Sequence, residues 1–412
     1  MPFLRVGKRE RGFAMRTMEN LGDVRGKRVL VRCDFNVPLK DGAIIDDGRI
    51  RAALPTLEEL RRRGAKVVIL AHLGRPKGTV VPELSLAPVA RRLSELMGCP
   101  VTLAKDTYGS DARRLVSDMQ DGDVIVLENV RFNPEETSKD ETVRSAYAAK
   151  IARLGDIFVS DGFGVVHRAQ GSDYDIAKLL PNAAGLLIQK EVANLSRATD
   201  NPDRPFTVVL GGAKVSDKLG VIRNLLGKAD RLLIGGGMSY TFLKAKGYEV
   251  GTSLLEPDMV GVAAGYMRTA QERGVELLLP VDVIVADRFA ADADALAVPV
   301  DAMPADRMGM DIGPRTRELF ADSIRGSKTV FWNGPTGVFE FPRFSQGTKA
   351  VADAVAQATK DGAFTIIGGG DSASAVRSLG FDDTEFSHIS TGGGASLEFL
   401  EDKPLPGLSV LE

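Results

Sequence analysis

The chain has 412 residues, of which 44% are hydrophobic and 26% charged, and its formal net charge is −2 at pH 7. This length accommodates about two to three globular domains, and the composition is typical of a soluble globular protein. This net charge gives no reason to expect binding to nucleic acid or to an anionic membrane, because both favour a basic protein surface.

The only two cysteines, Cys33 and Cys99, exclude a disulfide scaffold and favour a reducing, cytoplasmic location. No apolar run approaches the roughly 20 residues that a membrane helix needs. Residues 1–17 are basic but lack the apolar stretch of a signal peptide. We therefore expect a disordered extension or an early start codon there, with a targeting or docking role as the alternative.

Short β-branched runs alternate with helix-period segments along the chain, which is the pattern of parallel sheets with crossover helices. Strands are predicted at 28–33, 66–71, 124–127 and 157–160 in the first half, and at 207–210, 231–234, 275–278, 329–332, 365–367 and 388–390 in the second. Helices are predicted at 56–63, 86–97, 141–153, 349–358 and 373–379.

A domain boundary is indicated near residues 182–205. The segment AAGLLIQKEVANLSRATD is typical of one helix, and the two prolines of NPDRP end it before the next strand. We expect an N-terminal domain at 18–182 and a C-terminal domain at 183–395, joined by an interdomain helix at 183–200 that serves as a hinge. The sequence thus predicts an α/β fold of two Rossmann-like, three-layer domains with mostly parallel sheets.

Cationic and hydrogen-bonding side chains follow the strands of the first half. Because ligands bind beyond the carboxyl ends of parallel strands, these residues are predicted to form one pocket. Arginine suits such a pocket because its planar fork binds carboxylate and phosphate in a bidentate manner. Any one of them alone is more often a solvated surface charge. The residues are Arg32, Asp34, Asn36, His72, Arg75, Arg131, His167 and Arg168, and Arg49 is a candidate whose loop cannot be placed from the sequence.

The strands of the second half end in glycine, in VVLGGAK, LLIGGG, VFWNGP, TIIGGGDS and HISTGGGAS. Glycine lets backbone amides approach a phosphate, and a helix that starts there adds a favourable dipole. Gly368–Ser372 and Gly392–Ser396 lead into helices, so both are candidate phosphate cradles; tight turns are the alternative. Lys214 and Lys218, four residues apart, are predicted to share one face of a helix and to neutralise phosphate charge.

Several catalytic patterns are missing from the sequence. There is no GxxxxGK[ST], which excludes a P-loop enzyme, and no GxGxxG with a trailing acid, which argues against a dinucleotide dehydrogenase. Neither HExxH nor CxxC occurs, and no nucleophile–base set is evident. A carboxylate acceptor is already ionised at neutral pH and needs no general base. Together with the cationic pocket of the first half and the glycine ends of the second, these features favour phosphoryl transfer that involves a small acidic metabolite.

Ten motifs together resemble the phosphoglycerate kinase family, in order from about residue 20 to residue 412. They are KRVLVRCDFNVPL, AHLGRPKG, LENVRFNPEE, DGFGVVHRAQGS, GGAKVSDKLGVI, GGGMSYTFL, MDIGP, VFWNGPTGVFE, GGGDSASA and HISTGGGASLEFL. The resemblance implies reversible phosphoryl transfer (EC 2.7.2.3) between 1,3-bisphosphoglycerate and Mg-ADP, giving 3-phosphoglycerate and Mg-ATP. It also implies a monomer whose domains close over both ligands, with residues 396–412 packed on the N-terminal domain.

The resemblance carries roles over to individual positions. It implies acidic-metabolite binding by Asp34, Asn36, Arg49, His72, Arg75, Arg131 and Arg168. It implies a part in the transfer step for Arg32, Lys214, Lys218, Gly393 and Gly394. It implies nucleotide binding by Lys218, Gly309, Glu340, Gly369, Gly370, Asp371 and Ser372, with Asp371 as the Mg²⁺ partner. One departure is Gln170, which stands where the family usually has a histidine.

Three alternatives are weaker. A kinase for another small acid, such as acetate or an amino acid, lacks motif support. An oxidoreductase would need a nicotinamide fingerprint, which is missing. A catalytically silent binding protein predicts damaged positions in the site, and the sequence contains none. The choice between ATP and GTP stays open.

Overall fold

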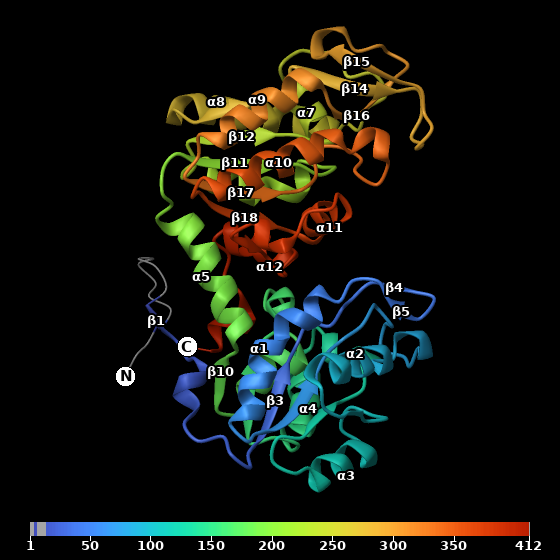
Figure 1. Ribbon diagram of the computed structural model, residues 1–412, viewed down its shortest axis with the longest axis vertical. Helices are drawn as coiled ribbons and strands as arrows, with labels where there is room; N and C mark the ends of the chain where they lie inside the picture. The colour runs from blue at the N-terminus through green and yellow to red at the C-terminus, as the bar shows by residue number, and fades with distance from the viewer. Residues whose placement is uncertain (1–3, 6–13, 412) are drawn as a thin grey trace. The chain divides into compact units, whose positions relative to one another are not determined.

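The computed structural model describes residues 4–5 and 14–411, which divide into two compact units (Figure 1). Unit 1 contains the described residues up to Ala193 and those from Pro404 onward, and unit 2 spans Asn194–Lys403. Each unit contains a six-stranded sheet whose neighbouring strands are parallel. The predicted α/β class with two mostly parallel sheets is confirmed. No helix of the described residues is long and apolar enough to span a bilayer.

The sheet of unit 1 has the strand order β10-β9-β3-β6-β8-β7. Its strands are β3 (Arg28–Arg32), β6 (Lys66–Leu70), β7 (Val101–Leu103), β8 (Val124–Val126), β9 (Ile157–Ser160) and β10 (Asn182–Ala184). Val29, Leu30 and Val31 of β3 are all fully buried. Both faces of a parallel sheet are covered, which is why this strand is a continuous apolar run and does not alternate.

Of the helices predicted in unit 1, all but one begin and end close to the predicted positions, and the helices at 110–118 and 406–409 were not predicted. They are α1 (Gly48–Arg62), α2 (Ala87–Met97), α3 (Ser110–Asp118), α4 (Glu141–Ala152) and the short α13 (Pro406–Ser409). Two-stranded antiparallel sheets are formed by β1 (Leu4–Arg5) with β2 (Ala14–Met15), and by β4 (Leu39–Lys40) with β5 (Ala43–Ile44). The exception is α1, which was predicted to start at Thr56. It contains Pro55 in its interior, although a proline there removes one helical hydrogen bond.

Most of the expected N-terminal extension, residues 1–17, lies outside the described residues. Its last residues belong to unit 1. Thr17 forms a parallel bridge with Ala184, and the Arg16 backbone N–H donates to the Leu411 carbonyl at 2.8 Å. For these residues the expectation of a disordered extension is wrong, because they are paired through the backbone.

The C-terminal tail of unit 1 begins later than predicted, at Pro404 and not at residue 396. Within it, the Gly407 backbone N–H donates to the Val166 carbonyl at 2.8 Å. Residues before Pro404 belong to unit 2, because α12 (Gly394–Leu400) packs against α6 (Leu219–Leu225).

The division between the units also differs from the predicted position after residue 182. It falls after Ala193, inside α5 (Leu186–Asp200). The reason is that β10 pairs with β9 and the first turns of α5 bond to unit 1; for example, the Leu187 N–H donates to Asp161 Oδ1 at 3.0 Å.

The sheet of unit 2 has the strand order β13-β12-β11-β17-β18-β19. Its strands are β11 (Phe206–Leu210), β12 (Arg231–Ile234), β13 (Glu276–Leu278), β17 (Thr329–Asn333), β18 (Phe364–Gly368) and β19 (His388–Ile389). Val209, Leu233, Trp332 and Ile367 from four neighbouring strands lie in one buried cluster. The carboxyl ends of these strands therefore meet at one edge of the sheet, where a ligand site is expected.

Unit 2 also has an antiparallel sheet that the sequence analysis did not predict. Its strand order is β15-β14-β16, with β14 (Asp282–Ala286), β15 (Ala295–Pro299) and β16 (Met308–Ile312). The remaining helices are α7 (Met238–Ala245), α8 (Val260–Arg273), α9 (Pro314–Arg325), α10 (Gln346–Lys360) and α11 (Gly370–Ser378).

Candidate active site

The carboxyl end of β3 carries a buried cluster of charged side chains. Arg32 is fully buried, Asp34 is 7% exposed and His72, which follows β6, is 3% exposed. The cluster is hydrogen-bonded, since Arg32 Nη2 donates to His72 Nδ1 at 3.2 Å and Arg49 Nη1 bonds to Asp34 Oδ2. Arg49 lies in the first turn of α1 (Gly48–Arg62), so the start of this helix places a cation at the carboxyl end of β3.

The protonation states in this cluster follow from its geometry. Burial alone would raise the pKa of Asp34, but the charges of Arg49 and Arg32 and a hydrogen bond from the Asn36 backbone N–H hold it below its usual value. Burial, reinforced by the neighbouring arginines, lowers the pKa of His72 well below its usual value. His72 is therefore neutral, and it accepts a hydrogen bond at Nδ1 because a guanidinium can only donate. The cluster thus contains an ionised carboxylate among several cations.

A second set of predicted residues lines a cavity of about 650 Å³ in unit 1. Arg75, Arg131 and Arg168 all contribute to its wall. Arg131 Nη1 donates to the Gly74 carbonyl at 3.0 Å, while its buried Nε has no partner among the described residues. Burial, with Arg32 and Arg168 nearby, lowers the pKa of Arg131 to about 10. Burial is the larger cause of this shift, and the two neighbouring guanidinium groups add to it as like charges.

Other residues of this cavity were not predicted. Lys77, Lys139 and Gln170 also line it, whereas Arg144 in its wall is paired with Asp175 at 2.5 Å. Lys77 lies two residues after Arg75 in AHLGRPKG, which is a signal that could have been used. Nothing local in the sequence indicates Lys139, because only the fold brings it to the cavity.

Asn36 and His167 lie at the margin of these clusters. Asn36 is exposed, and its Oδ1 accepts the Gly74 backbone N–H at 2.8 Å. Burial, with Arg168 beside it, lowers the pKa of His167 to about 4, so its imidazole is neutral. The expected anion contact by His167 would therefore depend on hydrogen bonding and not on charge.

Three of the five glycine ends in unit 2 are structural. A Cβ on Gly211 would lie 2.1 Å from the Pro335 carbonyl oxygen, one on Gly236 would lie 2.7 Å from the Gly212 backbone, and one on Gly334 would lie 2.4 Å from the Gly211 carbonyl oxygen. These loops need glycine because they pack against each other. None of these three ends belongs to the two candidate phosphate cradles, Gly368–Ser372 and Gly392–Ser396.

The turn before α11 has a different character. Gly369 has a φ of +92°, which favours glycine, and a Cβ there would lie 2.8 Å from Asn333 Nδ2. A Cβ on Gly370, the first residue of α11, would meet nothing within 4 Å. Asp371 is exposed in the first turn, whereas Ser372 is buried and accepts the Gly334 backbone N–H at 2.7 Å. The Gly370 Cα at the start of α11 therefore borders open space, whereas the Ser372 hydroxyl oxygen is engaged inside the unit.

Lys218 and Lys214 are placed differently from each other. Lys218 is 7% exposed, and its Nζ donates to both the carbonyl and the side-chain oxygen of Asn333. Burial lowers the pKa of Lys218 to about 8, although Asp371 and Asp217 act in the opposite sense. Lys214 is exposed and precedes the helix, so the predicted shared helix face is wrong. Lys218 ends the 3₁₀ turn Ser216–Lys218, whereas Lys214 lies in the loop before that turn.

The other predicted nucleotide residues are spread over unit 2. A Cβ on Gly309 would lie 1.9 Å from Tyr240 Oη, and its backbone N–H donates to Ser253 Oγ at 2.8 Å. Glu340 is exposed, in the turn after β17. Gly393 has a φ of +52° with open space where a Cβ would be, and Gly394 begins α12.

The residues present fit a Mg²⁺ ion that arrives with a nucleotide. No group of three His, Cys, Asp or Glu side chains within the described residues could hold a metal by itself. Mg²⁺ usually keeps several waters and binds through one or two carboxylates plus substrate phosphates. An exposed carboxylate such as Asp371, beside an open helix N-terminus, suits that mode of binding.

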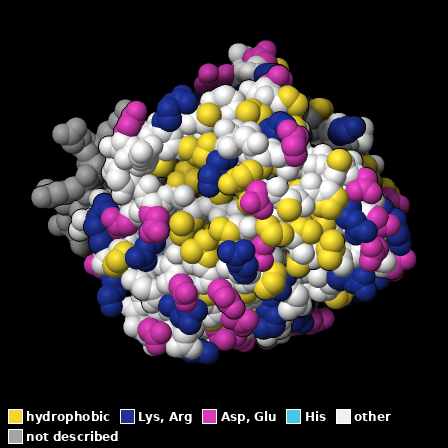
Figure 2. Space-filling view, turned by 90° about the horizontal axis from the view of Figure 1, so that it is seen from above, with side chains coloured by type: hydrophobic (Ala, Val, Ile, Leu, Met, Phe, Trp, Pro, Cys, Tyr) yellow, Lys and Arg dark blue, Asp and Glu magenta, His cyan; other side chains and the backbone are white. Residues whose placement is uncertain are grey.

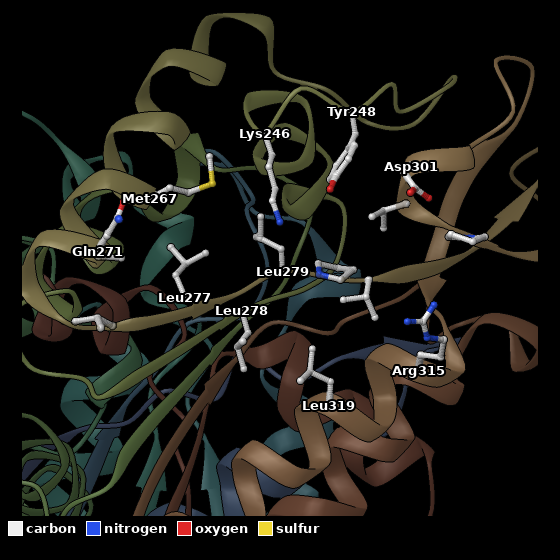
Figure 3. A pocket seen from close by; sticks show the side chains of 16 residues that line it. Lys246, Tyr248, Met267, Gln271, Leu277, Leu278, Leu279, Asp301, Arg315 and Leu319 are labelled. Atoms are coloured by element: carbon white, nitrogen blue, oxygen red, sulfur yellow. The ribbon is translucent and has the colours of Figure 1, made fainter.

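A second cavity, of about 620 Å³, lies elsewhere in unit 2 and contains none of the predicted site residues. Figure 3 shows Lys246 and Tyr248 pointing into it above Leu277 and Leu279, with Arg315 at one side. Figure 2, which views the end of unit 2 that carries α8, α9 and the antiparallel sheet, shows hydrophobic side chains in a hollow with Lys and Arg among them. This cavity is lined by both apolar and charged side chains, and none of the glycine-rich strand ends of unit 2 lines it.

A parallel α/β unit with converging guanidinium groups, and a second with an open glycine turn at a helix N-terminus, define a phosphotransferase for a small anion and a nucleotide. A family model described as "Phosphoglycerate kinase" matches residues 18–403. The chain therefore belongs to the phosphoglycerate kinase family. Its reaction is the reversible glycolytic transfer of a phosphoryl group between 1,3-bisphosphoglycerate and ADP, which gives 3-phosphoglycerate and ATP.

Curated relatives and solved structures agree with this family. A phosphoglycerate kinase of Bifidobacterium longum (strain DJO10A) is 69% identical over 97% of this chain and all of its own length. One of Clavibacter michiganensis subsp. michiganensis is 61% identical over 97% of this chain and 99% of its own length. The structure of phosphoglycerate kinase from Coxiella burnetii has a TM-score of 0.82 and 42% identity, and covers 96% of this chain and 98% of its own. That from Pyrococcus horikoshii OT3 has a TM-score of 0.81 and 33% identity over the same shares.

Proposed function

We propose that unit 1 binds 3-phosphoglycerate and 1,3-bisphosphoglycerate through Asp34, Asn36, Arg49, His72, Arg75, Arg131 and Arg168. The observation that carries this assignment is the convergence of Arg75, Arg131 and Arg168 on one cavity of about 650 Å³. The lowered pKa of Arg131 supports it, because a bound polyanion relieves repulsion among these cations. Asp34 orients Arg49 through their ion pair and lies close to the neutral His72. Arg49 and His72 can then both donate hydrogen bonds to the ligand.

Nucleotide binding is proposed for unit 2, through Lys218, Gly309, Glu340, Gly369, Gly370, Asp371 and Ser372. Open space at Gly370 supports a phosphate contact with the amides that begin α11. Asp371 would hold Mg²⁺, which neutralises phosphate charge when it is bound. Ser372 supports the turn by bonding to Gly334, and Lys218 supplies a cation beside Asp371.

Arg32, Lys214, Lys218, Gly393 and Gly394 are proposed to stabilise the phosphoryl group in transit. The acceptor is a carboxylate, so no general base is required and catalysis is electrostatic. Arg32 is fully buried in this structure, which means that a phosphoryl group reaches it only after neighbouring groups or the side chain move. We expect Arg32→Ala to lower kcat by at least about 10²-fold, the scale of one preorganised donor.

Binding of 3-phosphoglycerate measured by isothermal titration calorimetry tests the assignment of unit 1. Arg168 is exposed, so Arg168→Ala should fold normally while weakening binding by about 10- to 100-fold, the value of a hydrogen bond to a charged group. Arg91→Ala, at an exposed position of α2, is the matched control and should bind like the wild type. Equal affinity in all three proteins contradicts the assignment.

We further propose that the enzyme works as a cytoplasmic monomer with Mg-ATP or Mg-ADP and without nucleic acid. Both cysteines are free, which supports a reducing compartment. Sedimentation equilibrium checks the monomer, and a coupled assay with glyceraldehyde-3-phosphate dehydrogenase and NADH checks the Mg²⁺ requirement. A stable dimer, or full activity in the presence of EDTA, contradicts the respective statement.

A further inference from the structure

The buried guanidinium of Arg32 has an unusual set of partners. Its Nε donates to Ser172 Oγ at 2.9 Å, Nη1 donates to the Cys33 carbonyl, and Nη2 donates to His72 Nδ1 at 3.2 Å. All three acceptors are neutral, and no carboxylate of the described residues forms a direct ion pair with it. A guanidinium has five N–H groups, so one remains on each terminal nitrogen. Those two groups are suited to a bidentate contact with an oxyanion.

Ser172, which holds Nε, is itself held at two points by Glu136. Glu136 Oε1 accepts the Ser172 hydroxyl at 2.7 Å, and Oε2 accepts the Ser172 backbone N–H at 2.9 Å. Because the hydroxyl hydrogen is directed to Glu136, a lone pair of the same oxygen is left for Arg32. The neighbouring Gly171 permits this approach, since a Cβ there would lie 3.2 Å from Glu136 Oε2 and 2.7 Å from Tyr147. The chain Glu136–Ser172–Arg32 is therefore continuous.

Glu136 is also well placed to compensate the charge of Arg32. It lies in the 3₁₀ turn Pro134–Thr137 and is fully buried. Burial raises the pKa of Glu136 to about 7, while Arg32, the two bonds from Ser172 and Arg131 favour its ionised form. Asp173 is a second buried acid near Arg32, but it accepts Ser160 Oγ at 2.9 Å and has no bond to Ser172. Among the acids of the described residues, Glu136 alone joins charge and hydrogen bonding in one chain to the guanidinium.

We propose that Glu136, acting through Ser172, is a positioning residue that fixes the Arg32 guanidinium for contact with the phosphoryl group in transit. This inference rests on the role proposed above for Arg32. It differs from a purely structural role, in which Glu136 would only fasten the Gly171–Asp175 turn to the Pro134–Thr137 turn. A structural role acts on folding, whereas a positioning role acts on kcat and only while Arg32 is present.

A double-mutant cycle separates these two roles. Glu136→Gln is nearly isosteric, and we expect it to lower kcat by about 10- to 100-fold, on the scale of a misplacement of about 1 Å. The KM values for 3-phosphoglycerate and ATP should change by less than about two-fold, since the binding residues are untouched. In an Arg32→Ala background, the same substitution should change kcat by less than about two-fold, because nothing is left to position. Multiplicative losses in the cycle would overturn the proposal.

Two further variants control for charge and for folding. Asp173→Asn removes a buried acid near Arg32 without touching Ser172, and it should leave kcat within about three-fold of the wild type. If Asp173→Asn lowers kcat as much as Glu136→Gln does, the loss comes from removing a buried negative charge alone, and the proposed positioning role of Glu136 is overturned. If circular dichroism shows that Glu136→Gln does not fold, Ser172→Ala takes its place in the cycle with the same expected outcome.

The failures of the two proposals are distinguishable. Normal turnover in Arg32→Ala would refute the role of Arg32 itself, and with it this inference. A strong loss in Arg32→Ala together with normal turnover in Glu136→Gln would overturn the inference alone.

Discussion

Adding a methyl group at Gly370 would test the phosphate cradle at the start of α11. The backbone there is not in the left-handed region, and a Cβ would meet nothing within 4 Å. Gly370→Ala should therefore leave the fold intact and, because alanine loses less backbone entropy in a helix, stabilise it by at most about 1 kcal/mol. For a unit of this size that corresponds to a rise in Tm of up to about 4 °C.

The same methyl group should impair nucleotide binding. The new Cβ would project into the open space at the start of α11, where it would crowd a phosphate bound there. Loss of one hydrogen bond to a charged group costs about 1.5–3 kcal/mol, so we expect KM for Mg-ATP to rise by about 10- to 100-fold. KM for 3-phosphoglycerate should not change, since unit 1 is unaltered. Steady-state kinetics in the coupled assay measure both values.

The matched control is Gly261→Ala, in the first turn of α8, where a Cβ also has open space and the backbone is not left-handed. It should show the same small effect on Tm and no effect on either KM. If Gly370→Ala and Gly261→Ala have the same KM for Mg-ATP, phosphate binding at α11 is refuted.

Three other predictions concern unit 2. Because burial lowers the pKa of Lys218 to about 8, its cation is lost above that pH. Thus kcat/KM for Mg-ATP should fall as pH rises through about 8. Lys218→Arg should remove this inflection, because an arginine stays charged over this range. A flat wild-type profile of kcat/KM from about pH 7 to about pH 9.5 contradicts this role of Lys218. Asp371→Asn should raise the Mg²⁺ concentration for half-maximal activity by about ten-fold in a titration at fixed ATP, and an unchanged requirement would exclude Asp371 as the Mg²⁺ partner. Burial raises the pKa of Asp311 to about 7, so the folded state binds this proton more tightly than the unfolded state. As pH rises from about 4 to about 7, the free energy of unfolding of the wild type, measured with urea, should therefore fall relative to that of Asp311→Asn. If the two proteins show parallel plots of this free energy against pH, the link between Asp311 protonation and stability is disproved.

The sheets were predictable because their strands are short apolar runs buried on both faces. The strands at 157–160 and 231–234 have the predicted bounds, and the other predicted strands differ by one residue at one or both ends. The short strands β7 and β10 of unit 1 were not predicted. The antiparallel sheet was missed because β15 is mostly exposed and lacks a clear apolar alternation. The start of α1 was missed because proline is more common at the beginning of a helix than inside it, and Pro55 lies inside this helix.

The candidate site was only partly predictable. Strand-end arginines could be found from the sequence because all carboxyl ends of a parallel sheet lie at one edge. The sequence did not distinguish Lys214, which is exposed, from Lys218, which is buried against Asn333. Nor did it separate the glycines that face open space from those that pack against another loop, since both kinds occur in the same short motifs.

The sequence by itself determined the α/β class, the family and the identities of the residues that can bind phosphate and carboxylate, because these depend on local composition and spacing. Only the tertiary structure decided that Arg32 is fully buried and bonded to Ser172, which is 140 positions away in the chain. Burial, and with it the pKa of each group, depends on contacts between distant segments, and no short stretch of sequence contains that information.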